Sequence, residues 1–68
     1  MEEEFALFNA WVDRRLGIPL AAYKENQMQR RILTIMENSG AKTLREYQQL
    51  IEGDDGVRAD FLAHITIN

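Results

Sequence analysis

The chain has 68 residues, no cysteine, and eleven acidic against eight basic side chains, which gives a formal net charge of −3. This length allows one domain at most, with about 3–5 kcal/mol of stability, and the missing cysteines exclude disulfides and thiolate metal sites. The acidic balance disfavours a broad nucleic-acid interface, and no apolar run reaches the ~18 residues that a membrane-spanning helix needs.

The first predicted helix covers roughly residues 2 to 16. Its acidic first turn, Glu2 to Glu4, suits the positive end of the helix dipole, and Arg14 and Arg15 suit the negative end. Gly17 then supplies a left-handed stop. Residues at helical spacing form one apolar face: Phe5, Phe8, Trp11, Val12 and Leu16. Because a secretory signal would begin with basic residues, this acidic start predicts a cytoplasmic protein.

The second predicted helix begins at about Leu20 or Ala21, runs to Asn38 and ends at a Ser39-Gly40 turn. Its apolar arc consists of Met28, Ile32, Ile35 and Met36. Beside that arc, at 100° per residue, lies a polar stripe without any acid, formed by Lys24, Gln27, Arg31, Thr34 and Asn38. A solvated face and a docking surface for an anionic partner both fit this polar stripe, although a solubilising face usually mixes charges.

Two further helices follow. Thr43 and Glu46 form a capping box that starts a third helix, which Gly53 ends, and Asp54 or Asp55 caps a fourth. Their apolar faces are Leu44, Tyr47, Leu50 and Ile51, then Val57, Phe61, Leu62 and Ile65. We therefore expect an all-α, four-helix domain over residues 1–68, with a core that includes Phe5, Phe8, Trp11, Met28, Ile32, Tyr47 and Phe61. Both tyrosines, Tyr23 and Tyr47, should bury their rings and keep their hydroxyls in water.

Catalytic and metal-binding patterns are nearly absent. His64 is the only histidine, and we expect it to be a surface or boundary residue. Adjacent carboxylates at Asp54 and Asp55 are typical of a helix cap and not of a cation site. The sequence thus predicts no catalytic residue and no metal ligand, so this chain alone is not an enzyme. Its last four residues alternate apolar and polar side chains like a strand without continuation, which suggests a cut from a longer protein.

The order of four segments resembles the N-terminal domain of the chemotaxis receptor methyltransferases, the CheR family. The segments are "F..W", "GIPLAAYKENQMQRRI", "TLREYQQLIE" and "HITIN", and the resemblance covers Phe5 to Asn68. It implies an enzyme that transfers a methyl group from S-adenosylmethionine to glutamates on the cytoplasmic helices of chemoreceptors. The helical domain would cover the cofactor cleft of a following catalytic domain, absent from this chain, and offer its second helix to the receptor.

The resemblance also implies roles for individual residues. Lys24 and Arg31 would contact the receptor, and we add Gln27 because it lies with them on the polar stripe. Asn68 would contact S-adenosylmethionine in the full-length enzyme only, so we expect no cofactor on this fragment. Some family members carry further basic residues where this chain has Thr34, Ile35 and Glu37, so the electrostatic contact should be modest. The alternative is a stand-alone helical adaptor without an attached enzyme, and the reading frame beyond Asn68 would separate the two. A nucleic-acid-binding domain is a third, disfavoured reading.

Overall fold

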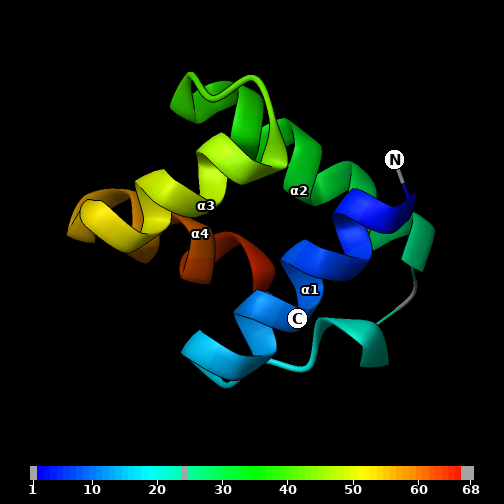
Figure 1. Cartoon of the computed structure of the whole chain (residues 1–68). Coiled ribbons are helices and arrows are strands. Elements are labelled where there is room, and N and C mark those ends of the chain that lie inside the picture. The colour runs from blue at the N-terminus through cyan, green and yellow to red at the C-terminus, as the bar shows by residue number, and fades with distance from the viewer. Residues whose placement is uncertain (1, 24, 67–68) are drawn as a thin grey trace.

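Four α-helices and one 3-10 turn make up the part of the chain that the computed structural model describes, residues 2–23 and 25–66 (Figure 1). In chain order they are α1 (Glu2–Leu16), η1 (Leu20–Ala22), α2 (Glu25–Ser39), α3 (Leu44–Gly53) and α4 (Asp55–Ile65). These described residues contain no strand, so the predicted all-α class is confirmed. In the strand-like tail, Ile65 is the last residue of α4, and Ile67 and Asn68 lie outside the described residues.

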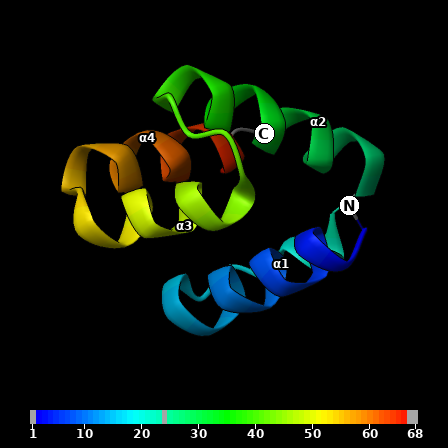
Figure 2. The ribbon, with the colours of Figure 1, turned by 45° about the horizontal axis from the view of Figure 1, so that its top comes forward.

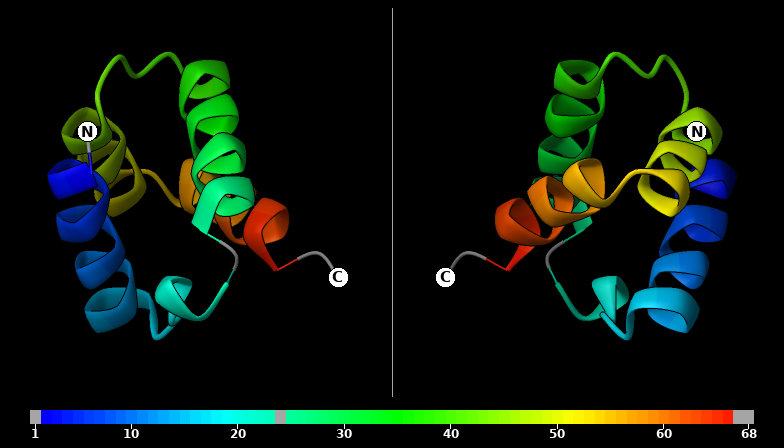
Figure 3. Two further views of the ribbon diagram at one scale, coloured as in Figure 1. Left: turned by 90° about the vertical axis from the view of Figure 1, so that its right-hand side faces the viewer. Right: turned by 90° about the vertical axis from the view of Figure 1, so that its left-hand side faces the viewer.

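The four helices pack around one core. α3 lies beside α4, and this pair is covered by α1 on the α3 side and by α2 on the α4 side (Figure 2). α1 and α2 make little backbone contact with each other, and the segment with η1 connects them at one end (Figure 3). Side chains, and not close backbone contacts, therefore link α1 to α2.

The predicted start of the second helix is wrong. Leu20–Ala22 form a separate 3-10 turn, closed by the Tyr23 N–H, which donates to the Leu20 carbonyl oxygen at 3.1 Å. Tyr23 itself has extended backbone (φ −92°, ψ 164°), so the helical hydrogen-bond ladder cannot run through it, and α2 begins only at Glu25. The first helix, in contrast, has the predicted bounds and ends at Gly17, whose φ of 73° needs a residue without a side chain.

Side-chain caps start the two short helices, with the threonine half of the predicted capping box at α3 and an aspartate cap at α4. The Thr43 hydroxyl accepts a hydrogen bond from the Glu46 N–H at 3.1 Å at the start of α3. Asp54, and not Asp55, caps α4, because its carboxylate accepts from the N–H groups of Gly56 and Val57 at 2.8 and 3.2 Å. These bonds satisfy donors that the first helical turn otherwise leaves open, so local sequence alone sets both starting points.

An aromatic cluster holds the core together. The ring of Phe8 stacks on Tyr47 at a centroid distance of 6.1 Å and meets Phe61 edge-on at 5.8 Å, which are favourable aromatic geometries. All seven residues predicted to share one core are buried in a single cluster: Phe5, Phe8, Trp11, Met28, Ile32, Tyr47 and Phe61. The core prediction is thus confirmed.

The two tyrosines depart from the prediction in opposite directions. Tyr47 is completely buried, and its hydroxyl has no hydrogen-bond partner among the described residues, because the ring lies between Phe8 and Phe61 deep in the core. Burial, together with the nearby carboxylate of Asp60, raises the pKa of Tyr47 to about 12. Tyr23 is instead 46% exposed, because it lies in the extended segment after η1.

Candidate functional site

The polar stripe lies on the outer surface of α2. Gln27, Arg31, Thr34 and Asn38 are all exposed, whereas Lys24 lies outside the described residues. The Thr34 hydroxyl donates to the Arg30 carbonyl oxygen at 3.0 Å, so it is tied to its own helix. Within residues 2–23 and 25–66, Arg31 forms no ion pair. Its guanidinium is therefore available to a carboxylate of a partner.

The polar stripe directly adjoins the buried side of α2. Met28, Ile32, Ile35 and Met36 are at most 6% exposed, which confirms the predicted apolar arc. Met28 and Arg31 are three residues apart and are therefore neighbours on the helix surface. Arg31 therefore lies beside one edge of the buried arc.

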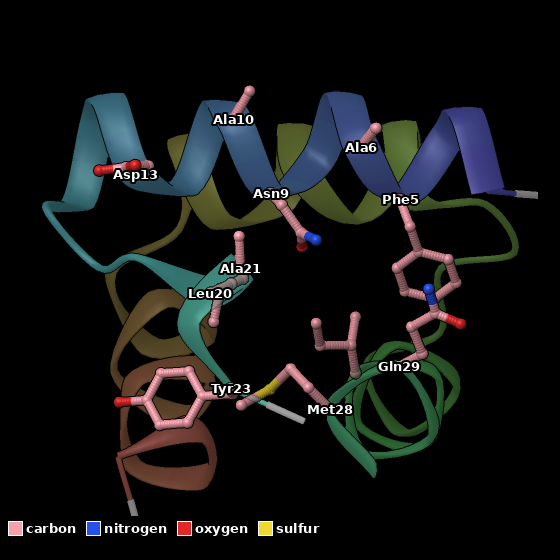
Figure 4. A pocket seen from close by; sticks show the side chains of 11 residues that line it. Phe5, Ala6, Asn9, Ala10, Asp13, Leu20, Ala21, Tyr23, Met28 and Gln29 are labelled. Atoms are coloured by element: carbon pink, nitrogen blue, oxygen red, sulfur yellow. The ribbon is translucent and has the colours of Figure 1, made fainter. Parts of the chain in front are cut away.

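A hollow of about 410 Å³ opens between α1, η1 and α2, and we call it the α1–α2 hollow (Figure 4). Its apolar lining comes mainly from Phe5, Leu20, Met28 and Ile32, all buried core residues. The partly exposed Tyr23 also lines it. This volume falls within the range of about 300–1,000 Å³ that is typical of ligand pockets.

Few polar groups face the α1–α2 hollow. The side chain of Asn9 points from α1 into it (Figure 4), and its carbonyl oxygen is buried without a hydrogen-bond partner among the described residues. Asp13, also on α1, is exposed and forms no ion pair within residues 2–23 and 25–66. Among the described residues, the titratable side chains that line the hollow are Asp13 and Tyr23, and no histidine, serine or threonine lines it. The lining suits the binding of an apolar group.

A second hollow, of about 260 Å³, lies beside Trp11 at the junction of α1, α3 and α4. Its arginines are engaged within the domain. The Nε of Arg15 lies 3.6 Å from a carboxylate oxygen of Glu52, and Arg58 donates to the Ile51 carbonyl oxygen at 3.3 Å and also pairs with the carboxylate of Asp55. Among the described residues, each arginine that lines this hollow therefore has a partner within the domain.

His64 lies at the boundary of the fold, as predicted. It is partly buried, and its Nδ1 is 2.7 Å from the Asp60 carbonyl oxygen and 3.5 Å from the carboxylate of the same residue. No group of three or more histidine, cysteine or acidic side chains that could hold a metal occurs within residues 2–23 and 25–66. No helix in the described part is long and apolar enough to cross a membrane.

The structure thus brings two of the four predicted site residues, Gln27 and Arg31, to one exposed face, whereas Lys24 and Asn68 fall outside the described residues. Sequence reasoning missed the α1–α2 hollow. One signal was present, because Asn9 stands four residues after Phe5 and three before Val12, on the apolar side of the first helix. An amide at such a position points to an incompletely packed region.

Comparison with known proteins identifies the family of this chain. A family model described as "CheR methyltransferase, all-alpha domain" matches residues 3–66. A "Chemotaxis protein methyltransferase" of Listeria monocytogenes is 37% identical over 68 residues, and one of Listeria innocua is 35% identical over the same length. Both alignments cover 100% of this chain but only 26% of the relative, so the chain spans about a quarter of their length. No solved structure matches the chain significantly. Since the family model covers nearly every residue, the chain belongs to the all-alpha domain family of CheR methyltransferases.

Proposed function

We propose that this chain is the N-terminal helical domain of an S-adenosylmethionine-dependent enzyme that methylates glutamates of chemoreceptors in the cytoplasm. The similarity of the whole chain to chemotaxis protein methyltransferases carries this proposal. In the full-length protein the domain covers the cofactor cleft of a catalytic domain and helps to recognise the receptor's methylation region. The reading frame offers a direct check, since a frame that ends at Asn68 would leave a stand-alone adaptor instead.

The receptor contact is assigned to Lys24, Gln27 and Arg31. Support comes from the exposure of Gln27 and Arg31 on one face of α2 and from the free guanidinium of Arg31. Methylation sites are glutamates, so the receptor helix that carries them is acidic. Cationic side chains steer such a helix during approach and fix its register once it is bound. The enzyme's chemistry remains with the catalytic domain, and this domain contributes to binding.

Reversal of two charges on α2 should slow receptor methylation. In the full-length enzyme, Lys24→Glu with Arg31→Glu replaces attraction with repulsion, and exposed ion pairs contribute about 0.2–1 kcal/mol each. We expect the methylation rate at low receptor concentration to fall about three- to tenfold, with a smaller loss at high receptor concentration. Added salt should lower the wild-type rate and shrink the difference between the two proteins.

A matched control for that experiment is Arg14→Glu with Arg45→Glu, which changes the net charge equally at exposed positions on α1 and α3. If the variant in α2 methylates receptor as fast as this control, the polar stripe is a solvated face and the assignment fails.

The cofactor should bind only when the chain continues. S-adenosylmethionine carries charged and hydrogen-bonding groups at both ends and needs several convergent polar partners. The α1–α2 hollow offers mainly apolar surface with Asn9, Asp13 and Gln29. We therefore expect calorimetric titration to give no binding to the 68-residue chain and clear binding to the full-length enzyme, weakened by Asn68→Ala. Micromolar binding to the 68-residue chain would move the cofactor site into this domain.

A further inference from the structure

One side of α1 faces no other helix of the domain. α1 packs mainly on α3 and η1, and Figure 3 shows it at the edge of the fold, with its far side uncovered by the other described helices. At 100° per residue, four exposed residues share an arc of about 60° on that side: Glu3, Leu7, Ala10 and Arg14. We call this surface the α1 outer face. No other residue of α1 falls within this arc, so these four side chains decide what can bind there.

The order of these four residues is complementary to itself when it is reversed. We propose that the α1 outer face binds the same face of a second copy of this chain, with the two α1 helices antiparallel. In a symmetric dimer each contact occurs twice, so paired residues must share one midpoint along the helix. Leu7 and Ala10 have the same midpoint as Glu3 and Arg14. Antiparallel pairing about this midpoint sets Glu3 against the partner's Arg14 at both ends. In the middle it sets Leu7 against the partner's Ala10.

The middle of the α1 outer face is apolar. Leu7 is 68% exposed, more than any other large apolar side chain in the described part of the chain. Single exposed leucines are common on monomeric proteins, so Leu7 alone would indicate nothing. The small side chain of Ala10 lets a partner helix approach closely, and a large residue against a small one fills the space between two helices. Steps of four, three and four residues along this face are also the spacing by which helices pack in coiled coils.

The charges at the two ends select the antiparallel orientation. Glu3 and Arg14 are exposed and form no ion pair within residues 2–23 and 25–66. Parallel pairing would set each of them against its own copy, and like charges in contact oppose association. Antiparallel pairing instead gives two ion pairs and places the two helix dipoles in opposite directions. A 15-residue helix is about 22 Å long, so this interface is small and the dimer is weak.

An exchange of charges tests the dimer in the full-length enzyme, by sedimentation equilibrium over a series of protein concentrations. We expect self-association with a Kd on the order of 100 µM, as for small transient interfaces. Glu3→Arg or Arg14→Glu alone sets like charges against each other at both ends and should weaken self-association about tenfold. The two changes together restore opposite charges and should return the Kd to within about threefold of the wild-type value. This recovery requires that the two residues meet across a two-fold axis.

Two further variants separate the dimer contact from the stability of α1, since both charge changes oppose the helix dipole. Leu7→Gln leaves all charges in place and should weaken self-association about tenfold, because it removes the apolar contact at two symmetric positions. Arg45→Glu, at an exposed position of α3, changes the net charge as Arg14→Glu does and should leave self-association unchanged. Circular dichroism at the measuring temperature shows whether each variant is folded. Such a weak dimer is not populated at the nanomolar enzyme concentrations of a methylation assay, so charge changes at Arg14 act there on the monomer.

Three results would overturn the inference. The first is a full-length enzyme that stays monomeric up to millimolar concentration; a lower melting temperature of Leu7→Gln would then mean that the catalytic domain covers the α1 outer face. The second is a dimer that neither Leu7→Gln nor the single charge reversals weaken. The third is a loss of self-association in the single reversals that the exchange does not restore, because the α1 outer face would then bind a different surface. The proposed receptor contact is tested separately, since it lies on α2.

Discussion

Truncation of Phe61 to alanine should abolish most of the folded population of this chain. Phe61 is 0% exposed and meets the rings of Phe8 and Tyr47 edge-on, each at 5.8 Å. Loss of a buried phenylalanine side chain costs about 3–5 kcal/mol, because both the transfer energy and the contacts around the new cavity are lost. A domain of this size has about 3–5 kcal/mol of stability in total, so the cost of the substitution is nearly equal to the whole free energy of unfolding.

Urea denaturation followed by circular dichroism would measure this loss, with two further variants for calibration. Ile32→Val removes one methylene from a fully buried position and should cost only about 0.5–1.5 kcal/mol. Leu7→Ala truncates a side chain that is 68% exposed and should hardly change the midpoint. A Phe61→Ala variant with the wild-type midpoint would show that the aromatic cluster does not hold the helices together.

The helices and the core could be predicted because their causes are local. Thr43 and Asp54 supply acceptors for nearby backbone N–H groups, and Gly17 permits a positive φ, so each boundary depends on a few adjacent residues. The same holds for the spacing of apolar side chains, which decides the face that each helix buries. A domain with a single core leaves these faces only one place to meet.

The features that the sequence did not reveal depend on how deeply a side chain is buried and on how segments distant in the sequence are placed. Helical spacing placed Tyr47 on the inner face, but only the packing of Phe8 and Phe61 around it decides that the hydroxyl is buried too. Tyr23 has extended backbone and ends η1, in the segment that connects α1 to α2. The α1–α2 hollow likewise exists only because these two helices lie apart, which no local pattern encodes.

For the candidate site, the sequence predicted the exposed stripe but not the α1–α2 hollow. The exposure of Gln27 and Arg31 follows from helical periodicity once the apolar arc is known, so it could be predicted from the sequence. Their contact with a receptor stays a prediction. The α1–α2 hollow depends on the relative position of α1, η1 and α2, and Asn9 became informative only when the structure placed it in the lining of that hollow.

Alkaline pH should destabilise this chain by ionising Tyr47. The pKa of Tyr47 is raised from 10.0 to about 12 in the folded state, because its hydroxyl is buried and Asp60 opposes a second negative charge. The unfolded state therefore loses this proton at lower pH than the folded state. The stability that the protonated tyrosine contributes is complete below pH 10 and is lost as the pH rises through 12, by about 1–3 kcal/mol.

Tyr47→Phe isolates this effect from the titration of lysines, which both proteins share. The variant keeps the ring in the aromatic cluster and removes the hydroxyl that lacks a partner, so at neutral pH it should be at least as stable as the wild type. Urea midpoints measured from neutral pH to pH 12 should then diverge, with the wild type falling more steeply than the variant. Tyr23→Phe, at a ring that is 46% exposed, should follow the wild-type curve. Parallel curves for wild type and Tyr47→Phe up to pH 12 would mean that water reaches the Tyr47 hydroxyl and that this part of the core is open.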